Sequence, residues 1–109
     1  MNDIEEIIQA LVEFRDERDW AQFHNPKDLA LALNIEAGEL LEAFLWKPSE
    51  QADINKVKEE LADVFAFAFL LAEKYEFDVK QILLKKIEKN ALKYPVAKSR
   101  GVAKKYTEL

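Results

Sequence analysis

Apolar residues near the start of the chain recur with the period of an α-helix. They occupy positions i, i+3, i+4 and i+7, which is typical of one face of an amphipathic helix. Asn2 or Asp3 can cap this helix, and we expect it to end near Arg18. The residues of this apolar face are Ile4, Ile7, Ile8 and Leu11.

A second helix is predicted after a short loop, residues 19–25. Asn25 is a favourable N-cap, Pro26 suits the first helical position, and Asp28 places a negative charge at the positive end of the helix dipole. The apolar pattern predicts that this helix continues to about Trp46.

Two further helices are predicted beyond a break at residues 47–49. Asp53 can cap a third helix that extends to about Tyr75, and Asp78 can cap a fourth that ends before Pro95. The tail after Pro95 has no helical period, so we expect no helix there. The positions of the third helix that we expect to face inward are Ile54, Val57, Leu61, Val64 and Phe65.

The second half of the third helix, Val64–Ala72, is apolar on every side. Its nine residues are far fewer than the roughly 18 that a membrane span needs. A helix that is apolar all round is buried on all sides, and one four-helix chain offers too little surface to cover it. We therefore expect a second copy of the chain to bury it; the alternative is a well-packed monomer.

The composition agrees with a helical protein. The chain has 109 residues, of which 50% are apolar, which predicts one domain spanning residues 1–109. Only two glycines and three prolines interrupt a sequence rich in helix formers, so the expected fold class is all-α. Because the chain has no cysteine, disulfide and thiolate chemistry are excluded.

Charge is distributed unevenly along the chain. The net charge of −5 argues against a nucleic-acid polymer as partner, since such binding needs a basic surface. The C-terminal tail, residues 93–109, instead holds five basic residues and one acid, which suits a ligand that carries phosphates. The N-terminus is acidic where a secretory signal is basic, so we expect a cytoplasmic protein that does not contact a membrane.

Two pairs of acids indicate a metal site. Glu36 and Glu39 share one face of the second helix, and Glu60 and Asp63 share one face of the third. Antiparallel packing of these helices would bring the pairs together. Four carboxylates without cysteine or a helical histidine favour a hard cation, Mg²⁺ or Mn²⁺.

Other interpretations of these acids are weaker. A di-iron site would need Glu-x-x-His motifs, and His24, the only histidine, lies in a loop where we assign it no role. Acidic side chains on a helix usually form a solvated surface face. This interpretation is favoured for Glu60, because Lys56 lies four residues before it and could form an ion pair with it. The apolar surroundings of Glu36 and Glu39 argue against it there.

The acids and their flanking residues resemble the MazG-like nucleotide pyrophosphohydrolases. In that family Glu-x-x-Glu is followed some twenty residues later by Glu-x-x-Asp; here the segments read IEAGELLEAF and EELADVF, with twenty residues between Glu39 and Glu60. The segments FRDERDWAQFHNP, EAFLWK, KNALKYP and SRGVAKKYTEL look like the dCTP pyrophosphatase branch. The similarity therefore covers nearly the whole chain.

This resemblance implies an all-α fold with a four-helix core assembled from two protomers, often within a tetramer built as a dimer of dimers. It implies that Trp20 and Trp46 enclose the base and that Asn90 contacts the nucleotide. The implied magnesium ligands are Glu36, Glu39, Glu60 and Asp63. The implied phosphate-binding residues of the tail are Lys93, Arg100, Lys104 and Tyr106.

The residues themselves leave alternatives open. A tryptophan at Trp20 or Trp46 can stack on a base or pack in an oligomer interface. Asn90 lies on an apolar helix face, where its amide needs a helix end or a ligand as partner. Leu11 stands where vertebrate members place a histidine near the base, and Phe67 where some have a tyrosine, so we expect broad base specificity.

The expected function is Mg²⁺-dependent hydrolysis of deoxynucleoside triphosphates to the monophosphate and pyrophosphate, with dCTP favoured and others such as dATP possible. Water would attack the α-phosphorus, with Glu39 as the candidate that orients or deprotonates it. Such an enzyme would serve nucleotide pool control or house-cleaning. The alternatives are a non-enzymatic helical interaction module and the same fold acting on dUTP, a modified nucleotide or a phosphoribosyl-nucleotide.

Overall fold

The computed structural model describes all 109 residues, and every regular element in it is helical. The prediction of an all-α fold is therefore confirmed. The chain forms two compact units, Met1–Phe77 and Asp78–Leu109, which are described separately below. No helix combines the length and the apolar character that crossing a membrane requires.

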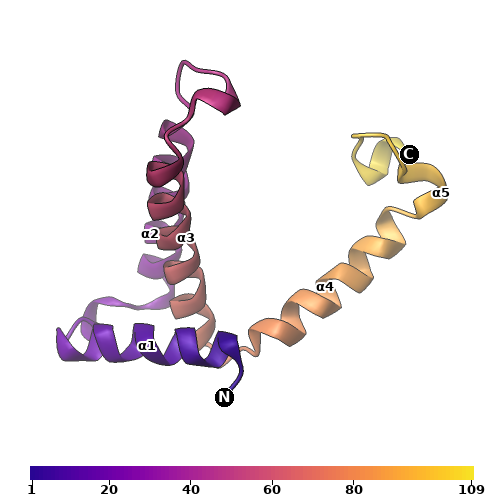
Figure 1. The fold of residues 1–109 in the computed structure, drawn as a ribbon. Helices are drawn as coiled ribbons and strands as arrows, with labels where there is room; N and C mark the ends of the chain where they lie inside the picture. Colours follow the sequence, from indigo (N-terminus) through magenta and orange to yellow (C-terminus); the bar gives the residue numbers. More distant parts are fainter. The chain divides into compact units, whose positions relative to one another are not determined.

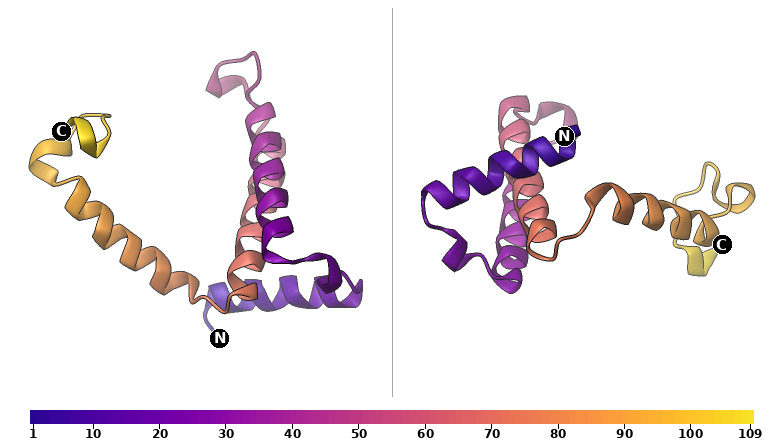
Figure 2. Two further views of the ribbon diagram at one scale, coloured as in Figure 1. Left: turned by 180° about the vertical axis from the view of Figure 1, so that it is seen from behind. Right: turned by 90° about the horizontal axis from the view of Figure 1, so that it is seen from below.

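The first unit is a helical hairpin crossed by a third helix (Figures 1 and 2). Helices α2 and α3 lie side by side and antiparallel. Helix α1 packs across the C-terminal part of α3. Short 3₁₀ turns occupy the two connections. The bounds are α1 Asp3–Glu17, η1 Ala21–Phe23, α2 Pro26–Glu42, η2 Ser49–Gln51 and α3 Ile54–Lys74.

Side chains at the helix starts act as the predicted caps. Asn2 accepts a hydrogen bond from the backbone N–H of Glu5 at 2.8 Å, and the Glu5 carboxylate returns one, which completes a capping box. Asn25, Asp53 and Asp78 each accept a backbone N–H of the first turn of their helix. These local hydrogen bonds fix where each helix begins.

Helix α2 ends at Glu42, four residues before the predicted end near Trp46. Beyond Glu42 the backbone bonds tighten to i→i−3 spacing, as in Leu45 N–H to Glu42 C=O at 3.1 Å. Trp46 then has a left-handed backbone with φ of 61°. The apolar period continues through these residues, but the α-helical hydrogen bonds do not.

Both α1 and α3 end in a Schellman motif whose left-handed residue is not glycine. After α1, Asp19 has φ of 54° and the N–H of Trp20 bonds the C=O of Arg15 at 3.1 Å. After α3, Glu76 has φ of 57° and the N–H of Phe77 bonds the C=O of Ala72 at 2.9 Å. Each motif turns the chain back toward its own helix.

The single chain covers only part of its apolar surface. Leu29, Ala43, Leu70 and Ala72 are buried in the first unit. Among the positions of α3 expected to face inward, Val57 and Val64 are half-buried, but the others remain exposed. The exposed ones are Ile54, Leu61 and Phe65.

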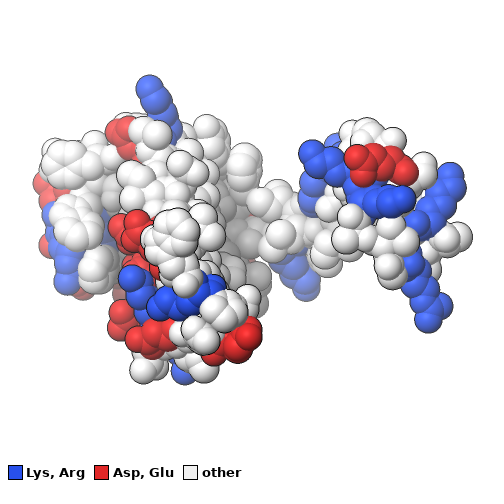
Figure 3. Space-filling model, turned by 90° about the horizontal axis from the view of Figure 1, so that it is seen from above, with Lys and Arg blue, Asp and Glu red and all other residues white.

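The second unit contains α4, Val79–Lys93, which confirms the predicted fourth helix. The tail also forms a one-turn helix, α5 Val96–Ser99, and a 3₁₀ turn, η3 Tyr106–Glu108, which the analysis of periodicity missed because each is shorter than one hydrophobic repeat. Gly101 has φ of 73° and makes a turn between them. Basic side chains predominate over this part of the chain in Figure 3.

Candidate metal centre and adjoining cavity

Three of the four predicted metal ligands meet between α2 and α3. Glu36, Glu60 and Asp63 each present a carboxylate oxygen, and these atoms lie within 4.8 Å of one another. The three-residue spacing on α3 puts Glu60 and Asp63 on one helix face, and the antiparallel hairpin sets that face against Glu36. The structure therefore brings together acids that are more than twenty residues apart in the sequence.

Glu39, the fourth predicted ligand, contacts the same cluster. Its carboxyl group lies within hydrogen-bonding reach of that of Glu36, one turn earlier on α2, and of that of Glu60 on α3. Two carboxyl groups can share a hydrogen bond only when one of them holds a proton. Without a cation, this close approach favours the protonated forms of Glu36 and Glu60.

The acid–base equilibria of the cluster reflect this crowding. Partial burial, the hydrogen bond with Glu39 and the charges of Glu39, Asp63 and Glu60 raise the pKa of Glu36 to about 7. Burial and the same neighbours raise the pKa of Glu60, although the positive charge of Lys56 opposes the shift.

The residues present fit a hard divalent cation. The Oε2 atoms of Glu36 and Glu60 are buried without a hydrogen-bond partner, and buried oxygens of this kind are normally satisfied. No ion pair of the protein neutralises the cluster. An oxygen-only set with this charge is the ligand type that Mg²⁺ and Mn²⁺ prefer.

A cavity of about 420 Å³ adjoins the acids. Glu36 and Asp63 form part of its wall, and most of the remainder is aromatic or aliphatic. A largely apolar hollow with a few polar groups is typical of a small-molecule site. The rest of the wall consists of Leu11, Phe14, Arg15, Trp20, His24, Ala66, Phe67 and Leu70.

Local structure explains how Trp20 reaches this cavity. The Schellman motif at the end of α1 reverses the chain at Asp19 and returns Trp20 to the helix. Its ring then packs edge-on against Phe14, with the ring centroids 5.8 Å apart. Leu11 and Phe67, the two departures noted in the sequence, also line the cavity.

His24, to which we assigned no role from the sequence, is part of the cavity wall. Its Nδ1 atom is buried without a hydrogen-bond partner, and its ring lies 6.4 Å from that of Phe67. Burial, together with the charges of Arg15 and Lys74, lowers the pKa of His24 and so favours the neutral imidazole at pH 7. Its contact with Phe67 joins residues more than forty positions apart, so the local sequence carries no signal for it.

Trp46 is not brought to the cavity. It lies at the end of α2 with 94% of its surface exposed and is absent from the cavity wall. The remaining predicted substrate contacts belong to the second unit. Within that unit the Nζ of Lys93 lies 4.9 Å from the centre of the Tyr106 ring, and the other contacts are exposed. These others are Asn90, Arg100 and Lys104.

Comparison with known proteins gives consistent results. A model of the MazG-like family matches residues 31–109, which include all four acids. Among curated proteins, dCTP pyrophosphatase 1 of Bos taurus is 42% identical over 97% of this chain and 68% of its own length. The protein of the same name from Mus musculus is 44% identical, over 97% of this chain and 67% of its own length.

A solved structure extends the similarity to the fold. The crystal structure of a pyrophosphatase from Archaeoglobus fulgidus matches with a TM-score of 0.81 and 38% identity, covering 87% of this chain and 94% of the other. The family match spans well over half of the chain, and the curated relatives match along nearly all of it. This chain belongs to the MazG-like family.

Proposed function

We propose that this protein is a Mg²⁺-dependent pyrophosphohydrolase that cuts deoxynucleoside triphosphates, dCTP foremost, to the monophosphate and pyrophosphate. Similarity to dCTP pyrophosphatases and to a pyrophosphatase of known structure supports a nucleoside triphosphate pyrophosphohydrolase. The observation that carries the proposal is the acidic cluster on the wall of an aromatic cavity. A triphosphate and its base need those two environments side by side.

Glu36, Glu39, Glu60 and Asp63 would hold the metal. When bound, Mg²⁺ would neutralise phosphate charge and lower the pKa of a water molecule. In the hydrolysis, a water oxygen attacks the α-phosphorus, and the bond from that phosphorus to the bridging oxygen of pyrophosphate breaks. Glu39 contacts acids of both helices and is our candidate to orient this water and accept its proton.

The cavity would take the base. Trp20, Phe14 and Phe67 offer ring faces and edges, and base–aromatic stacking contributes about 1–3 kcal/mol while tolerating any base. Asn90 and the basic tail residues of the second unit are proposed to contact the nucleotide and its phosphates. The basic tail residues are Lys93, Arg100 and Lys104, accompanied by Tyr106.

A substrate panel tests this proposal. We would measure kcat/KM for the four dNTPs, dUTP and CTP with the wild type and with Trp20→Ala. We expect dCTP to give the highest value, and we expect the substitution to raise KM about tenfold for every substrate, because it removes a stacking surface. Trp46→Ala is measured alongside: Trp46 lies outside the cavity wall of the single chain, so a rise in KM in this variant would support its predicted place beside the base in the oligomer.

Each alternative has its own outcome. No hydrolysis of any nucleotide would leave a helical interaction module as the better description. A modified nucleotide or dUTP far ahead of dCTP would keep the chemistry but replace the substrate. CTP equal to dCTP would contradict a preference for deoxynucleotides.

A further inference from the structure

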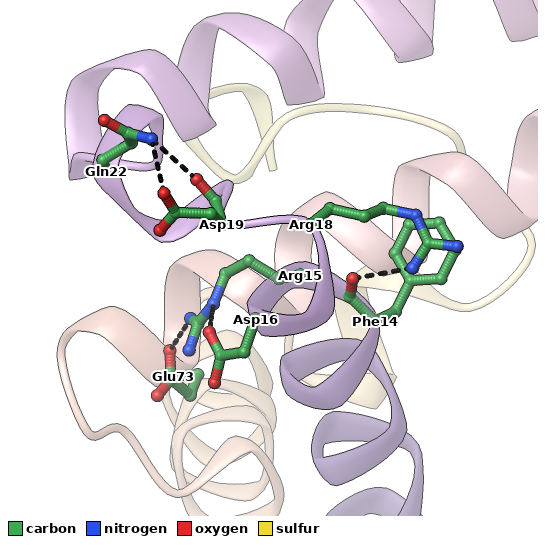
Figure 4. Close-up of polar contacts among 7 residues, drawn as sticks. All are labelled: Phe14, Arg15, Asp16, Arg18, Asp19, Gln22 and Glu73. Carbon is green, nitrogen blue, oxygen red and sulfur yellow. Dashed lines mark hydrogen bonds and ion pairs between the residues drawn. The ribbon is translucent and has the colours of Figure 1, made fainter.

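Arg15 is a buried cation on the cavity wall that neither the sequence analysis nor the proposed chemistry uses. Only 8% of its surface is exposed. Figure 4 shows its side chain leaving α1 and reaching between Asp16 and Glu73 of α3. Its Nε lies 2.8 Å from an Asp16 oxygen, and its Nη1 lies 3.0 Å from an oxygen of Glu73.

These ion pairs leave part of the guanidinium unsatisfied. An arginine has five N–H donors, and the two ion pairs use two of them. Arg15 itself lines the cavity, whereas Asp16 and Glu73 do not. The Nη2 atom makes no hydrogen bond within the chain and is not fully buried, so its N–H groups remain available to an acceptor on a molecule within the cavity.

Arg15 is well separated from the acidic cluster along the cavity. On α3, the wall residues Asp63 and Leu70 are seven positions apart, or about 10 Å at the rise of an α-helix. Arg15 pairs with Glu73, one turn beyond Leu70. A nucleotide whose phosphates lie at the acids therefore extends its base toward Arg15.

We infer that Arg15 is a specificity-determining residue that binds the edge of the base and favours cytosine over adenine. This inference rests on the proposed function. Cytosine has two adjacent acceptors, O2 and N3, which suit the N–H groups that Nη1 and Nη2 of Arg15 still offer beside its two ion pairs. In adenine the amino group lies between the acceptors N1 and N7, so this edge of the base offers no pair of neighbouring acceptors.

The inference changes an expectation drawn from the sequence. Broad specificity was expected because Leu11 carries no hydrogen-bonding group toward the base. Arg15 lies one turn after Leu11 on the same face of α1, and both line the cavity. Helix α1 therefore does carry a polar partner for the base, Arg15, which the apolar periodicity of this helix does not predict.

The experiment compares base discrimination in Arg15 variants with that in a variant of its ion-pair partner. The ratio of kcat/KM for dCTP to kcat/KM for dATP is measured in the wild type, Arg15→Met, Arg15→Lys and Glu73→Gln. We expect the ratio to fall about tenfold in both Arg15 variants, because each loses the planar pair of donors. Arg15→Lys keeps the charge opposite Glu73, so it provides the test if Arg15→Met fails to fold.

Glu73→Gln separates recognition from structure. It weakens the ion pair between α1 and α3 but removes no cavity residue, so we expect a lower melting temperature with an unchanged dCTP to dATP ratio. An unchanged ratio in Arg15→Lys, or an equal fall in Glu73→Gln, would overturn the inference while leaving the proposed function intact. Absence of dNTP hydrolysis by the wild type would overturn the proposed function itself.

Discussion

At the scale of single residues, the acidic cluster is the feature on which the proposed chemistry depends. Glu39→Gln and Asp63→Asn should each reduce activity at least a hundredfold while the circular dichroism of the helices is retained, because they remove charge at nearly constant volume. Glu59→Gln and Glu42→Gln, at exposed acids of the same helices, should remain active. Near-wild-type turnover in Glu39→Gln or Asp63→Asn would refute the metal assignment.

The raised pKa values of Glu36 and Glu60 give the metal-free protein a defined pH dependence. The folded state holds its proton on Glu36 up to a pKa of about 7, whereas the ordinary pKa of a glutamate is 4.5. Folded protein therefore binds more protons than unfolded protein between these values, and the free energy of unfolding should fall as pH rises through this window. Urea unfolding in the presence of EDTA at pH 4.5, 6 and 8 measures this change in the free energy of unfolding.

The affinity for a metal ion should rise with pH, whereas the stability of the metal-free protein falls. The reason is that the cation competes with protons for the same oxygens. Calorimetric affinity for Mg²⁺ should increase up to about pH 7, the pKa of Glu36, and then level off. Glu36→Gln should flatten the stability profile of the metal-free protein. A wild-type profile that rises between pH 5 and 7 would contradict the assigned protonation.

The sequence predicted the acids of this site but not all of its wall. Spacing alone places Glu36 and Glu39, and likewise Glu60 and Asp63, on common helix faces, because that relation is local. Arg15 and His24 belong to the wall through contacts with Glu73 and Phe67 of α3, which are distant in the sequence, and no local pattern encodes such contacts. Residues of this kind are found from tertiary contacts.

At the scale of helices, the starts were predictable because each cap is a side chain bonded to its own first turn. The end of α2 was predicted wrongly because apolar periodicity persists through a tightened turn to Trp46. The one-turn helix α5 is too short to show a period. Local chemistry therefore determines helix starts better than helix ends.

The end of α3 offers a test of this backbone description. Glu76 adopts φ of 57° within a Schellman motif, a conformation that costs a residue with a Cβ more than glycine. Glu76→Gly should therefore stabilise the protein by about 0.5–1 kcal/mol. Glu59→Gly, in the interior of α3, should destabilise it by about 1 kcal/mol. Denaturant unfolding of both variants tests whether Glu76→Gly raises the free energy of unfolding and Glu59→Gly lowers it.

At the scale of the whole molecule, exposed apolar residues indicate a surface that a second copy would cover. Ile7, Phe65 and Leu61 are all more than a third exposed. A groove of about 390 Å³ between α1 and α3 is lined only by apolar side chains. Scattered apolar residues are ordinary on a surface, but a contiguous apolar groove indicates an interface.

We accordingly predict a homo-oligomer, most simply a tetramer built as a dimer of dimers. Light scattering at micromolar protein should give a multiple of the 12.7 kDa chain mass. Phe65→Lys, which places a charge in the groove, should shift the distribution toward smaller species. A wild-type mass of one chain would contradict the prediction.

We propose that the acids of α2 and α3 support metal-dependent cleavage at the α-phosphorus of a deoxynucleoside triphosphate. The most direct measurement is product release from dCTP by the purified protein, with Mg²⁺ and with EDTA, in the wild type and Asp63→Asn. We expect dCMP and pyrophosphate in equal amounts from the wild type with Mg²⁺, and neither product with EDTA or in the variant. Release of orthophosphate with dCDP, or equal turnover in EDTA, would contradict it.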